Sequence, residues 1–314
     1  MAPRDPEDLP FPKSIGPYAL FMNGAKGGAT KYLTLQYLNY ARWTAQHHSV
    51  GILDAIRIVI RRNMYNAEGH FHPLGLARMW APHITILNEA VHWGIKVPTT
   101  IGLYDYSREM GFGPHSGLFL AVVADTCAEV AFCGWSERFG VHMGLNKITS
   151  YSESLRLSVK FRGSLLAGLY AGSGGLWVRN FFWNITFFEW KRFFHNSIDQ
   201  LPEWAPSLYC RHIMWLRGLD VKDQANILTF EAATLATYLT FFNMAGDNVK
   251  TKMSVDPQRY PTFIGTCKDI WASHGVVGFA RGSLFKGIYL ILGATVAIGI
   301  QERLSAIMAS FVGR

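Results

Sequence analysis

The segment Ala245-Gly-Asp-Asn-Val-Lys250 has two counterparts earlier in the chain, Tyr37-Leu-Asn-Tyr-Ala-Arg42 and Trp135-Ser-Glu-Arg-Phe-Gly140. Each copy ends an apolar stretch of helical character, and each places an acidic or amide residue three positions before a basic residue or its replacement. Self-similarity at a roughly fixed period is typical of repeat architectures. The sequence therefore predicts three related units within one chain.

The composition leaves two classes of helical protein open. Apolar residues make up 49% of the 314 residues, but no run of 18 purely apolar residues occurs, and the nearest is 287–300, directly after Lys286. Helices that span a lipid bilayer around a wet interior carry polar residues on their inward faces. A membrane bundle and a soluble all-helical protein both fit this pattern.

Charge and cysteine usage exclude several functional classes. The net charge of +8 suits an anionic membrane surface or anionic solutes, whereas the dispersed Lys and Arg disfavour a nucleic-acid partner. The four cysteines have no CxxC spacing, so we expect neither a disulfide framework nor a metal site.

We find no Ser/His/Asp constellation and no phosphate-binding glycine loop, so we expect no enzymatic activity and no cofactor. Residues 1–17 lack an apolar core, which disfavours a cleaved secretory signal.

Spacing within the units supports the repeat. Glu137 and Gly172 are 35 residues apart, as are Asp247 and Gly282, and each glycine precedes a long apolar stretch. The first unit is longer, which predicts an insertion around 63–72. We therefore expect an N-terminal extension over 1–17 and repeats over 18–112, 113–222 and 223–314, the second ending in a long link over 195–222.

Each unit reads as a long helix, an amphipathic surface helix and a second long helix. Gly24, Gly27 and Gly28 lie in the first long helix, where small residues allow close contact between helices in lipid. The amphipathic segment 51–62 combines an apolar face with a basic flank, which suits a membrane surface. Further long helices are expected over 118–143, 174–194, 227–253 and 284–304, with a second surface helix over 150–161.

These features resemble the mitochondrial carrier family, whose signature is Pro-x-Asp/Glu-x-x-Lys/Arg at the end of each odd-numbered helix. The resemblance covers nearly the whole chain and is closest at 246–253, at Arg281-Gly282, and at Tyr104-Asp105-x-x-Arg108. It implies an all-α membrane protein with six transmembrane helices in three pseudo-symmetric repeats and short amphipathic surface helices. The implied location is the mitochondrial inner membrane.

The departures from the family pattern form a consistent set. Tyr37, Trp135 and Ala245 replace the three signature prolines, whose family role is to bend the helix. In the family the acid of one repeat pairs with the base of the next. The resemblance therefore implies the matrix-gate salt bridges Glu137–Lys250 and Asp247–Arg42, and a third bridge lost at both ends, where Asn39 and Gly140 stand.

The resemblance also implies positions for substrate, lipid and the opposite gate. The substrate contacts of the family correspond to His92, Arg179, Asn180 and Tyr289. The opposite gate of the family corresponds to Tyr104, Asp105, Arg108 and Glu302. The cardiolipin sites of the family correspond to Tyr170, Gly172, Arg281 and Gly282.

Several of these assignments have alternatives that the sequence leaves open. Arg179 either meets a substrate anion or bonds helix carbonyls or an acidic neighbour. Asp125 and Glu129 share a helix face, and they either face the cavity, favouring a cationic solute, or pair with Arg179 or Lys31. In the second repeat, 188–192 matches the opposite-gate motif in residue type but lies about three residues early.

Two functions compete on this reading. In the first, the chain is a degenerate carrier that serves as a structural accessory subunit of a larger inner-membrane complex, plausibly of the respiratory chain. In the second, it is an antiporter of a small metabolite anion by alternating access. The aromatic and Arg-rich link 195–222 fits either a protein interface or the lipid interface.

Overall fold

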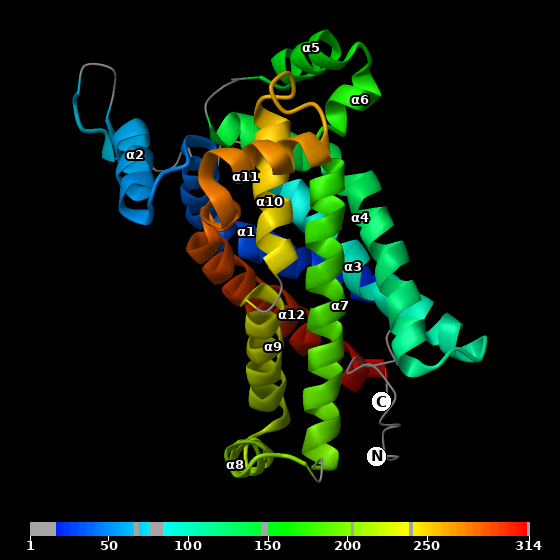
Figure 1. The fold of residues 1–314 in the computed structure, drawn as a ribbon. Coiled ribbons are helices and arrows are strands. Elements are labelled where there is room, and N and C mark those ends of the chain that lie inside the picture. Colours follow the sequence, from blue (N-terminus) through cyan, green and yellow to red (C-terminus); the bar gives the residue numbers. More distant parts are fainter. Residues whose placement is uncertain are drawn as a thin grey trace.

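The computed structural model describes residues 17–65, 69–73, 75, 84–145, 150–201, 204–238 and 241–312, with only the backbone described over 301–312. Within these ranges the chain is helical apart from its connections and one isolated antiparallel bridge between Tyr65 and Phe71 (Figure 1). The all-α class is thus confirmed for the described residues. Of the predicted N-terminal extension, only Pro17 is described, as the first residue of α1.

The chain combines long helices with short ones that lie between them. The long segments are α1 (Pro17–His48), α3 (Ile84–Glu109), α4 (Pro114–Gly144), α7 (Ser173–Asp199), α9 (Val221–Tyr238) followed by α10 (Phe241–Val255), and α12 (Ser283–Val312). The short helices are α2 (Ile52–Met64), α5 (Tyr151–Arg162), α6 (Leu165–Leu169), α8 (Ser207–Arg217) and α11 (Phe263–Phe279).

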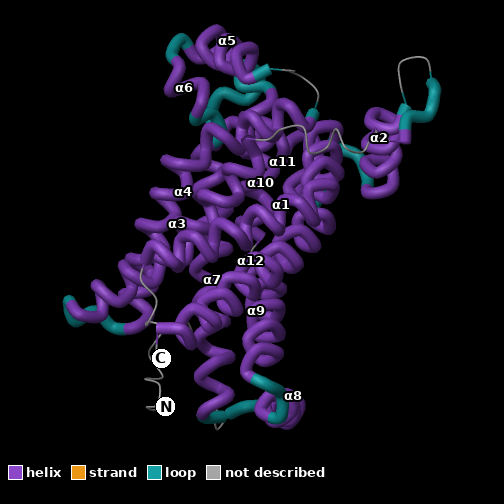
Figure 2. The backbone as a smooth tube through the Cα atoms, turned by 180° about the vertical axis from the view of Figure 1, so that it is seen from behind, coloured by secondary structure: helices purple, strands orange, loops and turns teal. Residues whose placement is uncertain are grey.

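The long helices pack in a closed ring. α1 lies between α3 and α12, α3 contacts α4, α4 contacts α7, α7 contacts α9 and α10, and α9 contacts α12. α1, α4 and α10 also contact one another, so these three helices converge at one level of the ring. Figures 1 and 2 show α5, α6 and α11 at one end of the bundle and α8 at the other.

The largest apolar cluster lies between α3, α4, α7, α8, α9 and α12 and is rich in aromatic rings. Tyr104, Phe187, Phe188, Leu216 and Leu228 are all buried in it. Full burial of side chains of this size contributes on the order of 2 kcal/mol each relative to exposure. The cluster therefore fixes α8, which lies outside the ring, against the ends of two ring helices.

Glycines set the closest helix crossings. A Cβ atom built on Gly24, Gly27 or Gly28 would lie under 3 Å from a backbone oxygen of a neighbouring helix, so the predicted close contacts of α1 are confirmed. Gly175 of α7 and Gly246 of α10 face each other in the same way, each with its virtual Cβ 2.7 Å from the other's carbonyl oxygen. No larger residue fits at this crossing without moving a backbone.

Two parts of the third repeat and its connection differ from the prediction. The helix expected over 227–253 is described as α9 and α10, and residues 239–240 between them lie outside the described residues. The link 195–222 contains the last turn of α7 and the whole of α8, which starts after Pro206 and ends at Gly218. A short α6 also follows α5. The repeat boundaries themselves stay predictions.

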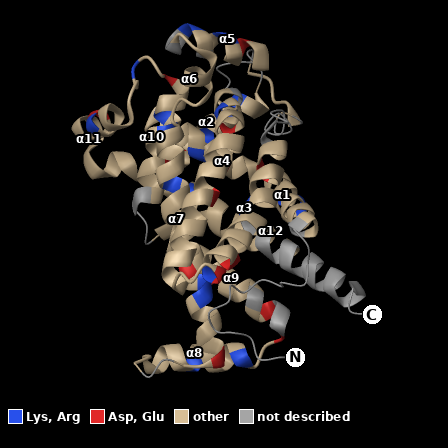
Figure 3. Ribbon diagram, turned by 90° about the vertical axis from the view of Figure 1, so that its right-hand side faces the viewer, with Lys and Arg blue, Asp and Glu red and all other residues tan. Residues whose placement is uncertain are grey.

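Hydropathy identifies fewer spans than the family resemblance implies. Among the described residues, Pro114–His142 is long and apolar enough to cross a membrane, and Phe263–Phe279 with Ser283–Ala297 passes only as a pair bent by 55°. The other long helices carry Lys and Arg along their length, and Figure 3 shows charged positions in the middle of the bundle as well as at its ends. Six transmembrane helices therefore stay a prediction.

The crossing of α7 and α10 predicts different outcomes for two adjacent glycines. Gly175→Ala should destabilise the protein by about 1–3 kcal/mol, because its methyl group meets a backbone oxygen. Gly174→Ala is the matched control, since its virtual Cβ lies 3.8 Å from Phe263 in ordinary contact. Thermal unfolding of the two purified variants in the same detergent measures the difference. Equal midpoints would contradict the close crossing.

Candidate functional site

A polar cavity lies at the centre of the helix ring. Its lining includes Lys31, Glu89, Lys96, Arg179 and Tyr289, and its cavity volume is about 50 Å³. These side chains come from α1, α3, α7 and α12, and almost all of them are buried. Charged groups this far from water are stable only when they are paired. The pairing therefore defines what the site can do.

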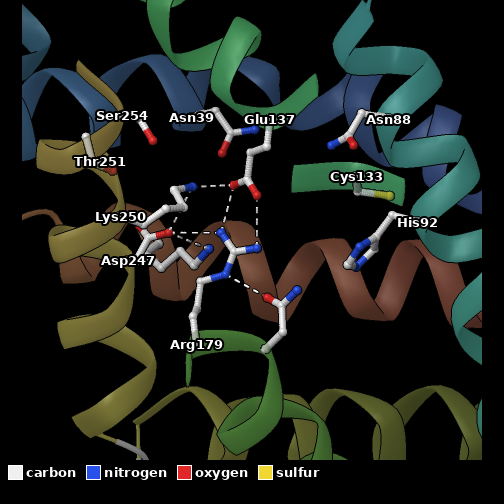
Figure 4. Close-up of polar contacts among 12 residues, drawn as sticks. Asn39, Asn88, His92, Cys133, Glu137, Arg179, Asp247, Lys250, Thr251 and Ser254 are labelled. Carbon is white, nitrogen blue, oxygen red and sulfur yellow. Dashed lines mark hydrogen bonds and ion pairs between the residues drawn. The ribbon is translucent and has the colours of Figure 1, made fainter. Parts of the chain in front are cut away.

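Arg179 is the centre of one cluster of ion pairs, at the level where α1, α4 and α10 converge (Figure 4). Its Nη1 donates to Glu137 Oε1 at 2.7 Å and to Asp247 Oδ1 at 3.0 Å, and its Nη2 lies 3.3 Å from Glu137 Oε2. Lys250 Nζ also donates to Glu137, and Arg42 Nε lies 3.6 Å from Asp247 Oδ2. Both ion pairs that the resemblance implied are present.

Asp247 has the largest set of donors in this cluster. Besides the two arginines, Gln46 Nε2 donates to it at 2.6 Å and Lys286 Nζ at 3.4 Å. Thr251 Oγ1 donates to Gln46 Oε1, the oxygen of the same amide, at 2.8 Å, which orients that amide. One fully buried carboxylate thus connects α10 to α1, α7 and α12.

At the position of the lost bridge, both residues are uncharged. Asn39 donates to Gln36 of its own helix at 3.0 Å, and Gly140 lies buried within α4. Neither position leaves a buried charge without a partner, since both charged groups of the family pattern are absent.

A second cluster of ion pairs lies beside the first, between α1, α3, α4 and α12. Lys31 donates to Glu89 at 2.9 Å, and the Tyr289 hydroxyl donates to the same carboxylate at 2.5 Å. Glu129 accepts from Lys96 at 2.5 Å and from Asn180 at 2.8 Å.

The fourth predicted contact residue is engaged in the same cluster. His92 Nε2 lies 3.5 Å from Glu129, so His92, Asn180 and Tyr289 each contact an acidic residue of the chain itself. The acidic-neighbour alternative for Arg179 is confirmed. The expected pairing of Glu129 with Arg179 or Lys31 was wrong. Glu129 pairs with Lys96 of the adjacent α3, whereas Lys31 pairs with Glu89.

Two other acidic residues have local roles. Asp125, one turn before Glu129 and fully buried, accepts from Asn184 at 3.2 Å. Glu231 of α9 pairs with His212 of α8 at 2.7 Å, which adds a polar contact to the apolar attachment of α8.

The expected opposite gate stays a prediction. Tyr104 is buried in the apolar core, and Arg108 donates to the Phe112 carbonyl at 2.7 Å in the turn after α3. Glu189 pairs with Arg192 of its own helix at 2.7 Å and with His115 of α4 at 2.9 Å. Asp105 lies in the last turns of α3, and the side chain of Glu302 lies outside the described residues.

The residues predicted to bind cardiolipin have structural roles in the helix connections. Gly172 and Gly282 adopt φ angles of 89° and 74°, a left-handed conformation that favours glycine, directly before α7 and α12. The Tyr170 hydroxyl donates to the Ala131 carbonyl at 2.6 Å, and Asn248 donates to the Arg281 carbonyl at 2.9 Å. Lipid binding at these residues stays a prediction.

Sequence reasoning missed several polar residues of the site, among them Glu89, Lys96, Asn184 and Lys286, and a helical spacing test would have found these four. Glu89 and Lys96 lie three residues before and four residues after His92, so all three share one face of α3. Lys286 is likewise three residues before Tyr289. Asn184 is four residues after Asn180, so it shares that residue's face of α7.

No protein-family model matches the chain, and no curated protein sequence matches it. Fold and site geometry therefore carry the functional argument.

The Asp247 contacts predict a large effect of a small substitution. Asp247→Asn removes the charge that faces Arg42, Arg179 and Lys286, and we expect a loss of about 3–5 kcal/mol of stability. Asp54→Asn is the control, because its 3.2 Å pair with Arg57 is exposed and should contribute less than about 1 kcal/mol. Denaturant titration in detergent measures both. Similar small losses would show that the buried cluster does not hold the ring together.

Proposed function

We propose that the chain has the mitochondrial carrier fold, with six transmembrane helices in three pseudo-symmetric repeats. Three observations support this: the order of long, short and long helices, the closed ring, and the ion pairs of Glu137 with Lys250 and Asp247 with Arg42 at the expected helix ends. The charges that lower the hydropathy of the ring helices pair with one another inside the ring. Such helices can span a membrane despite their charges, because lipid then meets apolar surfaces.

Within that fold, the protein acts as a structural accessory subunit of a larger inner-membrane complex, plausibly of the respiratory chain. The observation that carries this proposal is the internal pairing of every residue expected to contact a substrate. His92 and Asn180 contact Glu129, Tyr289 contacts Glu89, and Arg179 contacts Glu137 and Asp247. A solute would have to replace these contacts before it gained any of its own.

Arg179 also makes the closed state harder to open. A carrier alternates by separating the ion pairs of its odd-numbered helices, which here are Glu137–Lys250 and Asp247–Arg42. In this chain a guanidinium from α7 bonds both carboxylates as well. Breaking a buried pair typically costs about 3–5 kcal/mol when one partner is left alone. With the helix-bending prolines absent, the arrangement favours one fixed state.

The inner-membrane location and the cardiolipin partner belong to the same proposal. The net charge of +8 suits an anionic leaflet. α2 is strongly amphipathic, and the residues Gly172 and Gly282 place helix N-termini at the end of the bundle where α5 and α11 lie. The protein would then be a lipid-compatible body whose outer surface serves assembly.

A subunit of a complex should not migrate alone. We expect the protein, extracted from its native membranes in a mild detergent, to run in an assembly of several times its own 35.3 kDa. Native electrophoresis followed by mass measurement of the band tests this. Recovery of the whole population as a single chain with bound lipid would overturn the structural-subunit function.

One observation favours the second candidate, an antiporter of a small metabolite anion by alternating access. Counted over the two clusters and the adjacent Asp125, the cations outnumber the carboxylates by six to five, which favours an anionic solute. The cations are Lys31, Arg42, Lys96, Arg179, Lys250 and Lys286, and the carboxylates are Glu89, Asp125, Glu129, Glu137 and Asp247.

Reconstitution separates the two functions. We expect liposomes that contain the purified protein to exchange labelled di- and tricarboxylates, phosphate and nucleotides no faster than protein-free liposomes, because the contact residues are already paired. Exchange of any of these anions that is abolished by Lys286→Gln would instead establish the antiporter. Lys268→Gln, on the surface helix α11, is the matched control for the loss of one charge.

A further inference from the structure

α8 is a rigid platform with a buried inner face. Ile213 and Leu216 are fully buried in the main apolar cluster. Arg217 Nε donates to the Ile198 carbonyl near the end of α7 at 2.6 Å, and Gln224 donates to the Leu216 carbonyl at 2.9 Å. α8 is thus held across the ends of α7 and α9 (Figures 1 and 2). Its outer face is presented in one orientation.

That outer face is apolar and aromatic around a single cation. Leu208 is 75% exposed, Met214 64% and Trp215 53%, and Trp204, just before the helix, is 71% exposed. At 100° per residue, Arg211 falls between Met214 on one side and Leu208 and Trp215 on the other. The exposed positive charge therefore lies in the middle of the apolar strip, and not at its edge.

α2 shows the opposite arrangement, which is typical of a helix at a lipid surface. Its exposed apolar residues Leu53, Ile56 and Ile60 form one strip, and Arg57 and Arg61 lie along the edge of that strip. Cations at the edge reach the headgroups while the apolar strip enters the leaflet. An arginine at the centre of the strip would be carried into the acyl region, which is unfavourable.

We infer that the outer face of α8, together with Trp204, docks a protein partner that presents a carboxylate among apolar side chains. A carboxylate would accept two parallel hydrogen bonds from Arg211, and the surrounding apolar contacts would exclude water from that pair. Aromatic residues and arginine are enriched in the energetic centres of protein interfaces. The inference rests on the proposed function as an accessory subunit and assigns its attachment surface.

Two features favour tight docking by a different chain. The Trp204 ring is stacked on Phe193, with centroids 6.0 Å apart, so little side-chain freedom is lost on binding. A second copy of this chain fits poorly, because a two-fold pairing of α8 faces would bring two Arg211 side chains together near the axis.

Charge reversal tests this surface. We expect Arg211→Glu to lower the fraction of the protein in the high-mass assembly at least about tenfold, whereas Arg57→Glu on α2 leaves it unchanged. Both variants are expressed in the native membranes, and thermal midpoints of the purified proteins establish that each is folded. An assembly that persists with Arg211→Glu would overturn the inference, provided the wild-type protein is in the assembly. A wild-type protein that runs alone would instead overturn the proposed function.

A photocrosslinking amino acid identifies the occupant. Benzoylphenylalanine in place of Leu208 should give one protein product, cross-linked near an Asp or Glu of the partner, and in place of Leu53 on α2 it should give lipid products. Lipid products alone at position 208 would show that α8 lies on the membrane and would overturn the inference. A product of twice the mass of this chain would overturn it in favour of a second copy.

Discussion

The structure depends on the guanidinium of Arg179 lying between two carboxylates, the partly buried Glu137 and the fully buried Asp247. This contact joins α4, α7 and α10, and Asp247 extends it to α1 through Arg42 and to α12 through Lys286. Charges with so little access to water are tolerated only when they are paired and hydrogen-bonded. The positions of five ring elements are therefore coupled through one small group of atoms.

The same constraint limits what the cavity can do. A transport site must exchange its contacts with a solute and with two states of the protein. Here the second cluster, Lys31 with Glu89 and Lys96 with Glu129, leaves the central side chains bonded to each other. A ring held shut on the inside, with a fixed outer platform at α8, fits the role of a structural subunit. On the proposed function, the apolar strip of α2 would face lipid and the outer face of α8 would face a protein partner.

Sequence reasoning predicted the parts of the molecule that repeat. The pairs Glu137–Lys250 and Asp247–Arg42 followed from aligned copies of one signature, and most long helices followed from apolar stretches bounded by glycine or charge. The pairs Lys31–Glu89 and Lys96–Glu129 did not follow, because they depend on which helices are neighbours and how each is rotated. Neither glycine nor proline stands between α9 and α10 to predict the end of one helix and the start of the next. α8 was not predicted, because its residues lie in the segment that we expected to be a connecting link.

A double-mutant cycle on Glu137→Gln and Arg179→Met tests the central claim most directly. If this contact holds the ring together, the double variant should be more stable than the sum of the two single losses predicts, by more than about 1 kcal/mol. Single losses that add to within about 0.5 kcal/mol would show that the two residues act independently and would contradict the account.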